Sequence, residues 1–163
     1  MKEKKSLFYA HVHAQICYLN IIWQNAPNYV TSKISITLNK FMRTIFWEQY
    51  LDPNIRTIDL YKTNNIMTLS QINYFESALY IYKVKNNLIK NNLDIHLLSE
   101  THQYYTRNMD NIRVATPRTN YIRFSCIYPA IANFNNLPTD VKNIPTIYTF
   151  KKILKRYVTE NIV

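Results

Sequence analysis

The chain has 163 residues, and its 20 Lys and Arg against 10 Asp and Glu give a formal net charge of +10. It contains no glycine, which excludes glycine-rich phosphate loops, dinucleotide-binding fingerprints and nucleophile elbows, because each needs backbone without a Cβ. With 47% hydrophobic and 14% aromatic residues it can bury a core, and its basic balance favours a polyanionic partner, nucleic acid first and an anionic membrane surface second.

The first predicted element is a helix over residues 5–24, where apolar residues lie on all sides, as in the central helix of a bundle. Pro27 ends it, because proline cannot extend a helix. The uncharged stretch 6–32 resembles a membrane anchor, but it is interrupted by polar residues that are costly in hydrocarbon: His11, His13, Gln15 and Asn20. We therefore expect a buried helix and no membrane partner, with peripheral membrane association as the weaker alternative.

A second helix is predicted from an N-cap at Thr31 or Ser32 to about Trp47. Its apolar face comprises Ile34, Leu38, Phe41 and Ile45. Its opposite, basic face comprises Lys33, Lys40 and Arg43. The pattern is that of an amphipathic helix with one buried and one solvated side.

Two further helices follow in the first hundred residues. A short one is expected over 56–62, and a long one from an N-cap at Ser70 to Asn87. The long helix is expected to bury Ile72, Phe75, Leu79 and Tyr82. The asparagine-rich stretch 86–92 predicts a turn, because asparagine tolerates turn geometry where glycine is missing.

The last third predicts one small β-hairpin near 112–124, a short helix capped by Ser125 that ends before Leu137, and a final helix over 146–160. The apolar face of the final helix comprises Ile147, Phe150, Ile153, Leu154, Tyr157 and Val158. Its basic face comprises Lys151, Lys152, Lys155 and Arg156. The predicted fold class is therefore mainly α, a helical bundle with one small hairpin.

Side chains for catalysis or metal binding are not grouped in the sequence. No two aspartates are adjacent, and His11 and His13 face different directions on a helix, so neither pattern predicts a metal site. Cys17 and Cys126 are too few and too far apart for a disulfide framework or a zinc cage, which favours a reduced, intracellular chain. We expect no cofactor, no metal and no catalytic activity.

Binding features are clearer, because basic side chains recur beside aromatic ones between residues 102 and 124. Arginine and lysine bind phosphates, and an aromatic plane can stack on an unpaired base. Together with the two basic helix faces, the candidate nucleic-acid-binding residues are Lys33, Lys40, Arg43, His102, Tyr104, Thr106, Arg107, Arg118, Tyr121, Arg123, Lys151, Lys152, Lys155 and Arg156. For the lysines of the last helix the alternative is an ordinary solvated face, and for Tyr104 and Tyr121 it is core packing.

Five short motifs occur in an order that resembles a known family. They are Tyr18–Trp23, Ile36–Ile45, the set His102, Tyr104, Thr106 and Arg107, the block Ser125–Pro138, and Phe150–Tyr157. This order is similar to the C-terminal thumb and post-thumb region of jockey-like reverse transcriptases, the RNA-directed DNA polymerases of retrotransposons without long terminal repeats. The resemblance implies a helical thumb-like region over 1–100 and a C-terminal region over 101–163 that grip template RNA or an RNA–DNA hybrid.

The resemblance also implies what this chain lacks. In the family, catalysis lies upstream in a palm strand with two adjacent aspartates, a motif that this sequence does not contain. Gln24 and Tyr128 stand where the family has glycine, so strain is expected there. The sequence thus predicts a truncated reverse-transcriptase fragment that binds RNA or hybrid. The alternatives are a protein-interaction module, suggested by the uncharged stretch 6–32, or a remnant without specific binding.

Overall fold

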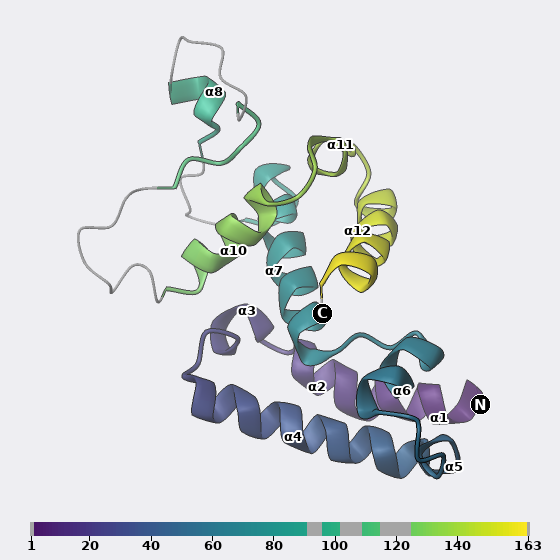
Figure 1. The fold of residues 1–163 in the computed structure, drawn as a ribbon. Helices are drawn as coiled ribbons and strands as arrows, with labels where there is room; N and C mark the ends of the chain where they lie inside the picture. Colours follow the sequence, from purple (N-terminus) through teal and green to yellow (C-terminus); the bar gives the residue numbers. More distant parts are fainter. Residues whose placement is uncertain (1, 91–95, 102–108, 115–124, 163) are drawn as a thin grey trace. The chain divides into compact units, whose positions relative to one another are not determined.

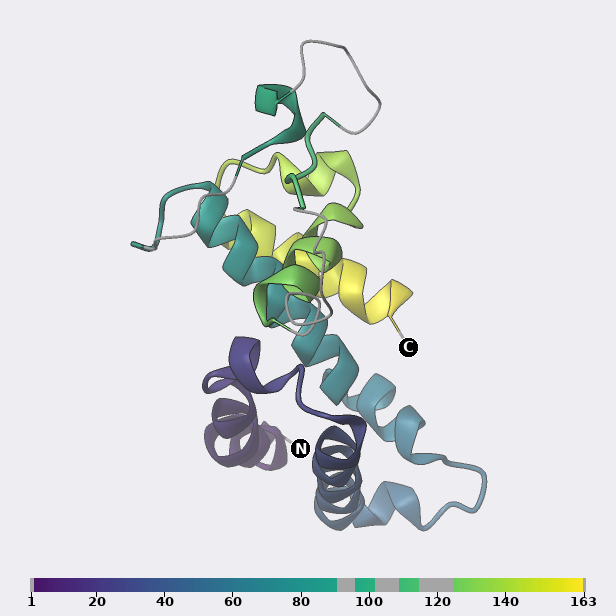
Figure 2. The ribbon, with the colours of Figure 1, turned by 90° about the vertical axis from the view of Figure 1, so that its left-hand side faces the viewer.

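The computed structural model describes residues 2–90, 96–101, 109–114 and 125–162. The fold is mainly α, as predicted, and its helices are shown in two views in Figures 1 and 2. The chain divides into two compact units, Met1–Asn73 and Tyr74–Ile162. The boundary between the two units falls inside helix α7 (Leu69–Lys85).

The N-terminal segment of the first unit is an interrupted helix. It consists of α1 (Lys2–Leu7), the π-helical turn η1 (Phe8–His13), α2 (Ala14–Cys17) and α3 (Asn20–Trp23). Leu19 adopts a left-handed conformation with φ of 49°, which breaks the helix between α2 and α3. The prediction of one continuous helix over 5–24 is therefore wrong.

This segment is also less buried than the sequence predicted. Phe8, Ile16 and Asn20 are buried, whereas Leu7, Tyr18 and several other apolar side chains are exposed. The amide of Asn20 donates to the Ile16 carbonyl at 3.4 Å and to Asn73 Oδ1 at 2.8 Å. A polar side chain thus ends α2 and fixes the break, and the segment is not the central helix of a bundle.

Helix α4 (Asn28–Ile45) runs alongside the α1–α2 segment, as both ribbon views show (Figures 1 and 2). It begins directly after Pro27, earlier than the predicted caps. Thr31 and Ser32 lie in its first turn, where their hydroxyls donate to the carbonyls of Asn28 and Tyr29, each at 3.3 Å. The short helices α5 (Trp47–Tyr50) and α6 (Thr57–Asn64) complete this unit before α7 begins.

Helix α7 begins with a capping box formed by Thr68 and Gln71. The Thr68 amide donates to Gln71 Oε1 at 2.9 Å, and the Gln71 amide donates to Thr68 Oγ1 at 3.4 Å. The predicted cap, Ser70, lies inside the helix. The predicted turn after the helix is confirmed at Asn87, whose φ of 54° is left-handed, while residues 91 and 92 lie outside the described part.

The second unit packs α10 (Ile127–Asn135), α11 (Thr139–Lys142) and α12 (Ile147–Asn161) with the C-terminal part of α7. The ring of Tyr82 on α7 stacks on Phe150 of α12, with centroids 3.9 Å apart and planes 13° from parallel. The Tyr82 hydroxyl also donates to the Ile144 carbonyl at 2.6 Å. These contacts fix the buried side of α12.

Ile112 joins Leu97, just before helix α8 (Leu98–Thr101), in an antiparallel bridge. The predicted hairpin near 112–124 falls mostly on residues 115–124, which lie outside the described residues. The N-cap of α10 is Cys126 and not the predicted Ser125, which lies one residue earlier and accepts from the Tyr128 amide through its hydroxyl at 3.4 Å.

Backbone strain is not found at the two positions where the family that the chain resembles has glycine. Gln24 has a right-handed helical φ of −57°, and Tyr128 lies inside α10. The left-handed residues in the described ranges are instead Leu19, Asn65 and Asn87. Two of the three are asparagines, the non-glycine residue that accepts this conformation most readily. In the parts of the chain that the structure describes, no helix has the length and apolar character to cross a bilayer.

Candidate nucleic-acid interface

Helix α12 presents a basic face on a firmly packed helix. Phe150, Leu154 and Val158 recur at helical spacing and are fully buried. The opposite side carries the predicted basic residues, of which Lys155 is half-buried and the others are exposed: Lys151, Lys152, Lys155 and Arg156. Because the buried side fixes the helix, these positive charges have a defined spacing rather than lying on a loose segment.

The charges on this face are not equivalent. Arg156 Nε lies 3.0 Å from Glu160 Oε1, one turn further along, so part of its charge is already neutralised. Lys151, Lys152 and Lys155 have no acidic partner within the described ranges. Three of the four predicted side chains are therefore available to bind an anion, and the arginine is the least available.

The sequence reasoning missed an aromatic side chain on the same face. Tyr148 has 78% of its surface exposed and lies three residues before Lys151 and four before Lys152. Residues at these spacings are neighbours on a helix surface. The signal that could have found it is this i, i+3, i+4 spacing, since Tyr148 does not belong to the apolar set that packs against the core.

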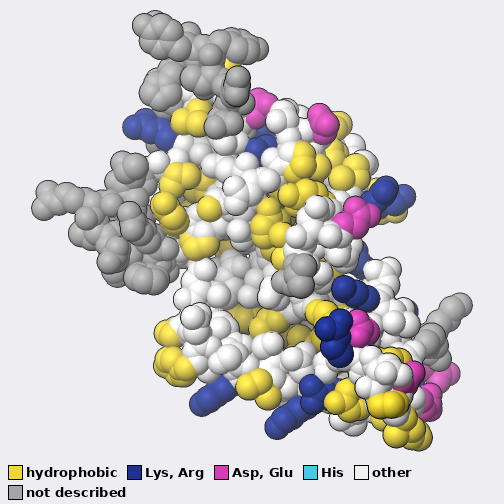
Figure 3. Space-filling model, in the orientation of Figure 1, with side chains coloured by type: hydrophobic (Ala, Val, Ile, Leu, Met, Phe, Trp, Pro, Cys, Tyr) yellow, Lys and Arg dark blue, Asp and Glu magenta, His cyan; other side chains and the backbone are white. Residues whose placement is uncertain are grey.

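The basic face of α4 belongs to the other unit and is built differently. Lys33, Lys40 and Arg43 are all exposed, and Lys or Arg side chains project from the surface over α4 in Figure 3. Arg43 already has partners in its own unit, however: its Nε donates to Thr57 Oγ1 at 2.8 Å, and its guanidinium carbon lies 5.2 Å from the centroid of the Tyr50 ring. Lys33 and Lys40 are therefore the available charges of this face.

The remaining predicted residues fall outside the described ranges. They are His102, Tyr104, Thr106, Arg107, Arg118, Tyr121 and Arg123. The structure thus places the two helical groups of candidate residues, one in each unit, and leaves the aromatic and arginine-rich group as a prediction.

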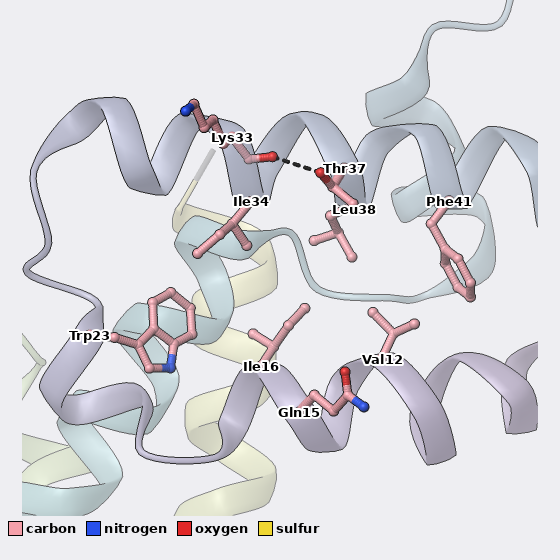
Figure 4. Close-up of a pocket in the computed structure, with 9 residues that line it drawn as sticks. All are labelled: Val12, Gln15, Ile16, Trp23, Lys33, Ile34, Thr37, Leu38 and Phe41. Atoms are coloured by element: carbon pink, nitrogen blue, oxygen red, sulfur yellow. Dashed lines mark hydrogen bonds between the residues drawn. The ribbon is translucent and has the colours of Figure 1, made fainter.

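An apolar groove of about 560 Å³ lies between α2, α3 and α4 in the first unit. Figure 4 shows the side chains of Ile16, Trp23 and Ile34 directed into the space between the helices, together with those of Val12, Leu38 and Phe41. The ammonium group of Lys33 points away from the groove, and its carbonyl accepts from the Thr37 hydroxyl at 2.9 Å. The groove therefore offers apolar surface and little charge.

The second unit contains a buried lysine, Lys142, that donates hydrogen bonds to its neighbours. Lys142 has 5% of its surface exposed, and its Nζ donates to Asn111 Oδ1 and to the Asn135 carbonyl, each at 2.7 Å. Burial lowers the pKa of Lys142, an effect opposed by the nearby Asp110 carboxylate, and burial lowers the pKa of Lys85 as well. Lys142 therefore belongs to the interior and Lys85 is half-buried, and neither is part of the exposed basic faces.

Groups suited to metal or nucleophilic chemistry are sparse in the ranges that the structure covers. No cluster of three or more His, Cys, Asp or Glu that could hold a metal ion is found among those residues. Cys17 Sγ lies 3.4 Å from His13 Nδ1 on the adjacent helical turn, a pair that the i, i+4 spacing could have indicated. Both side chains are half-buried in the first unit.

No protein family, no curated protein and no solved structure was found to match the chain.

Proposed function

We propose that this chain is a non-catalytic, intracellular nucleic-acid-binding protein, similar to the C-terminal region of a retrotransposon reverse transcriptase, that binds RNA or an RNA–DNA hybrid. The observation that carries the proposal is the α12 face, on which Lys151, Lys152 and Lys155 are spaced along one helix without acidic partners in the described residues. Lysines of this kind bind phosphates and release counterions from a nucleic acid.

Two further observations support the proposal. The net charge of +10 attracts a polyanion over a longer range than any single contact. Lys33 and Lys40 provide a second exposed basic face on α4. The proposal assigns no catalytic step to this chain, because the family that it resembles carries its catalytic aspartates upstream of the matching region.

The test is fluorescence anisotropy of the full chain with a structured RNA, a single-stranded DNA and an RNA–DNA hybrid over a salt series. We expect saturable binding tighter than micromolar at physiological salt, with RNA or hybrid preferred. The variant K151Q/K152Q/K155Q should weaken binding and flatten its salt dependence. On duplex DNA, each lost phosphate contact lowers the slope of log K against log salt concentration by about 0.9.

A charge-matched variant separates a defined site from general attraction. K62Q/K83Q/K90Q removes the same three charges from positions outside both basic faces. If both triple variants weaken binding by the same factor, only the net charge of the chain matters, and the proposal of a binding site on α12 is wrong. Weak binding that is equal for all three probes and disappears at modest salt contradicts the proposed function.

The groove of the first unit favours a second candidate function, a protein-interaction module. Its apolar lining and the exposed apolar side chains Leu7, Leu19 and Ile22 of the same unit fit an apolar helix of a partner protein. Trp23 lines the groove, and W47F removes the other of the two tryptophans. In W47F the tryptophan fluorescence therefore comes from Trp23 and reports whether a partner occupies the groove. Concentration-dependent association in sedimentation velocity, with a Trp23 shift and no effect of RNA, supports this candidate over the first.

A further inference from the structure

We infer that the α12 face binds unpaired nucleotides, with Tyr148 stacking on a base while the neighbouring lysines hold the flanking phosphates. The inference rests on the proposed function and specifies its ligand. It is carried by an exposed aromatic ring next to lysines that have no acidic partner among the described residues, on one face of a packed helix. None of the motifs described above includes Tyr148.

The position of Tyr148 gives the face an aromatic plane. With 78% of its surface exposed, the side chain contributes little to the core, and no hydrogen bond of its hydroxyl is found to any described residue. The packed side of α12, formed by Phe150, Leu154 and Val158, holds the backbone beneath it. The ring is therefore supported by a fixed helix and free to accept a planar partner.

The spacing of the lysines suits this role. Lys151 and Lys152 follow Tyr148 by one helical turn, about 5 Å along the axis, and Lys155 follows by two turns, about 10 Å. Each lysine carries its ammonium group on a flexible four-carbon stem, so it can reach phosphates on either side of a stacked base. A base on Tyr148 would then have its own backbone phosphates within reach of the lysines.

This combination distinguishes unpaired nucleotides from two other anionic partners. In a duplex the faces of the bases are covered by their neighbours, so a surface tyrosine has no base plane to stack on. An acidic peptide would satisfy the lysines but has no base plane for the ring. Stacking on an aromatic side chain is tolerant of sequence, so the expected ligand is a single strand of any composition.

The test measures binding of the full chain to oligo(U), oligo(dT), an RNA duplex and an RNA–DNA hybrid duplex by anisotropy. The inference narrows the proposed preference to unpaired RNA, so we expect oligo(U) to bind more tightly than either the RNA duplex or the hybrid duplex. Y148A should weaken binding to the single strands by about tenfold, the effect of losing one stacked base. Y148A should leave duplex binding and the salt slope unchanged, and Y148F should stay within about twofold of the unaltered chain, because it keeps the ring.

Two controls make the result specific. Y18A removes an equally exposed tyrosine from the other unit, where 72% of the Tyr18 surface is accessible, and it should leave all affinities unchanged. The triple lysine variant K151Q/K152Q/K155Q should lower the salt slope on single strands by about 0.7 for each lost contact. Comparing oligo(U) with oligo(dT) shows whether the ribose contributes.

The outcomes separate this inference from the proposed function. If the unaltered chain binds nucleic acid but Y148A binds oligo(U) as well as it does, the stacking inference is wrong and the proposed function stands. If no probe binds saturably, the proposed function is wrong. If a polyglutamate peptide displaces oligo(U) at equal charge concentration, the face is a general anion site and the inference is overturned.

Discussion

The side-chain amide of Asn135 pairs with the backbone of Ile112 through two hydrogen bonds of 2.9 Å each. Asn135 Oδ1 accepts from the Ile112 amide, and Asn135 Nδ2 donates to the Ile112 carbonyl. The Asn135 amide thus pairs with the Ile112 backbone as an adjacent β-strand would, and Ile112 is only 1% exposed. Lys142 in turn donates to the Asn135 carbonyl at 2.7 Å, so one asparagine connects the segment around Ile112 with α10 and α11.

Replacing Asn135 with alanine should therefore destabilise the second unit. N135A leaves the amide and the carbonyl of a buried residue without these partners, at a cost of about 2 kcal/mol in the free energy of unfolding. Urea unfolding followed by circular dichroism measures it. N136A is the matched control, because Asn136 is exposed at the end of the same helix and should change stability by less than about 0.5 kcal/mol. Equal effects of the two variants would contradict the role of the amide.

The stacked pair Tyr82 and Phe150 gives a second prediction. F150A removes a fully buried ring from α12 and should cost about 3–5 kcal/mol. Y82F keeps the ring but removes the hydroxyl that donates to the Ile144 carbonyl, and it should cost about 1 kcal/mol. The control Y80F alters a half-buried tyrosine on the same helix and should be close to neutral. Thermal unfolding ranks the three, and a Y82F variant as stable as Y80F would contradict the hydrogen bond.

Helices were predictable where periodicity alone decides them. The buried side of α12 follows from the recurrence of Phe150, Leu154 and Val158, so its basic face could be read from the sequence as well. The start of α7 was misplaced because Ser70 and Thr68 are both plausible caps. The deciding partner is Gln71, which lies three residues after Thr68 and closes the capping box.

Features that depend on contacts between distant residues were not predictable. The break after α2 is fixed by Asn20, which bonds to Asn73 far along the chain. The apolar groove exists because α4 lies beside the α1–α2 segment, a placement that no local pattern specifies. Among the candidate charges, the pairing of Arg156 with Glu160 follows i, i+4 spacing, whereas the contact of Arg43 with Thr57 arises from tertiary structure.

Leu19 offers a stabilising substitution. Its φ of 49° places a residue with a Cβ and a large side chain in the left-handed region, while 52% of its surface stays exposed. The chain uses asparagine at its other left-handed positions in the described ranges, Asn65 and Asn87. L19N should therefore raise the free energy of unfolding by about 0.5–1 kcal/mol. L19A keeps the unfavourable conformation and should bring no gain; if it stabilises as much as L19N, backbone strain is not the cause.

Two lysines with lowered pKa values, the buried Lys142 and the half-buried Lys85, predict that stability increases with pH on the alkaline side. Burial lowers the native pKa values of Lys142 and Lys85 below the ordinary value of 10.5. Between the lowered and the ordinary pKa the unfolded chain binds more protons than the native one, so the free energy of unfolding rises with pH. Tyrosines act in the opposite direction above pH 10, because burial raises their pKa values, that of Tyr74 to about 12. Stability should therefore rise with pH in the interval just below the ordinary lysine pKa, and the tyrosines should reverse this trend above about pH 10.

Urea unfolding at a series of pH values at constant ionic strength tests this expectation. K142M removes the more buried of the two amines, so the rise of stability with pH below about pH 10 should become smaller, although Lys85 retains its part. The absolute stability of K142M also changes, because Asn111 Oδ1 and the Asn135 carbonyl lose a donor, and the slope is therefore the quantity to compare. K90M alters an exposed lysine and should keep the slope of the unaltered chain. A flat or falling curve for the unaltered chain below pH 10 would show that these amines are not held at lowered pKa values.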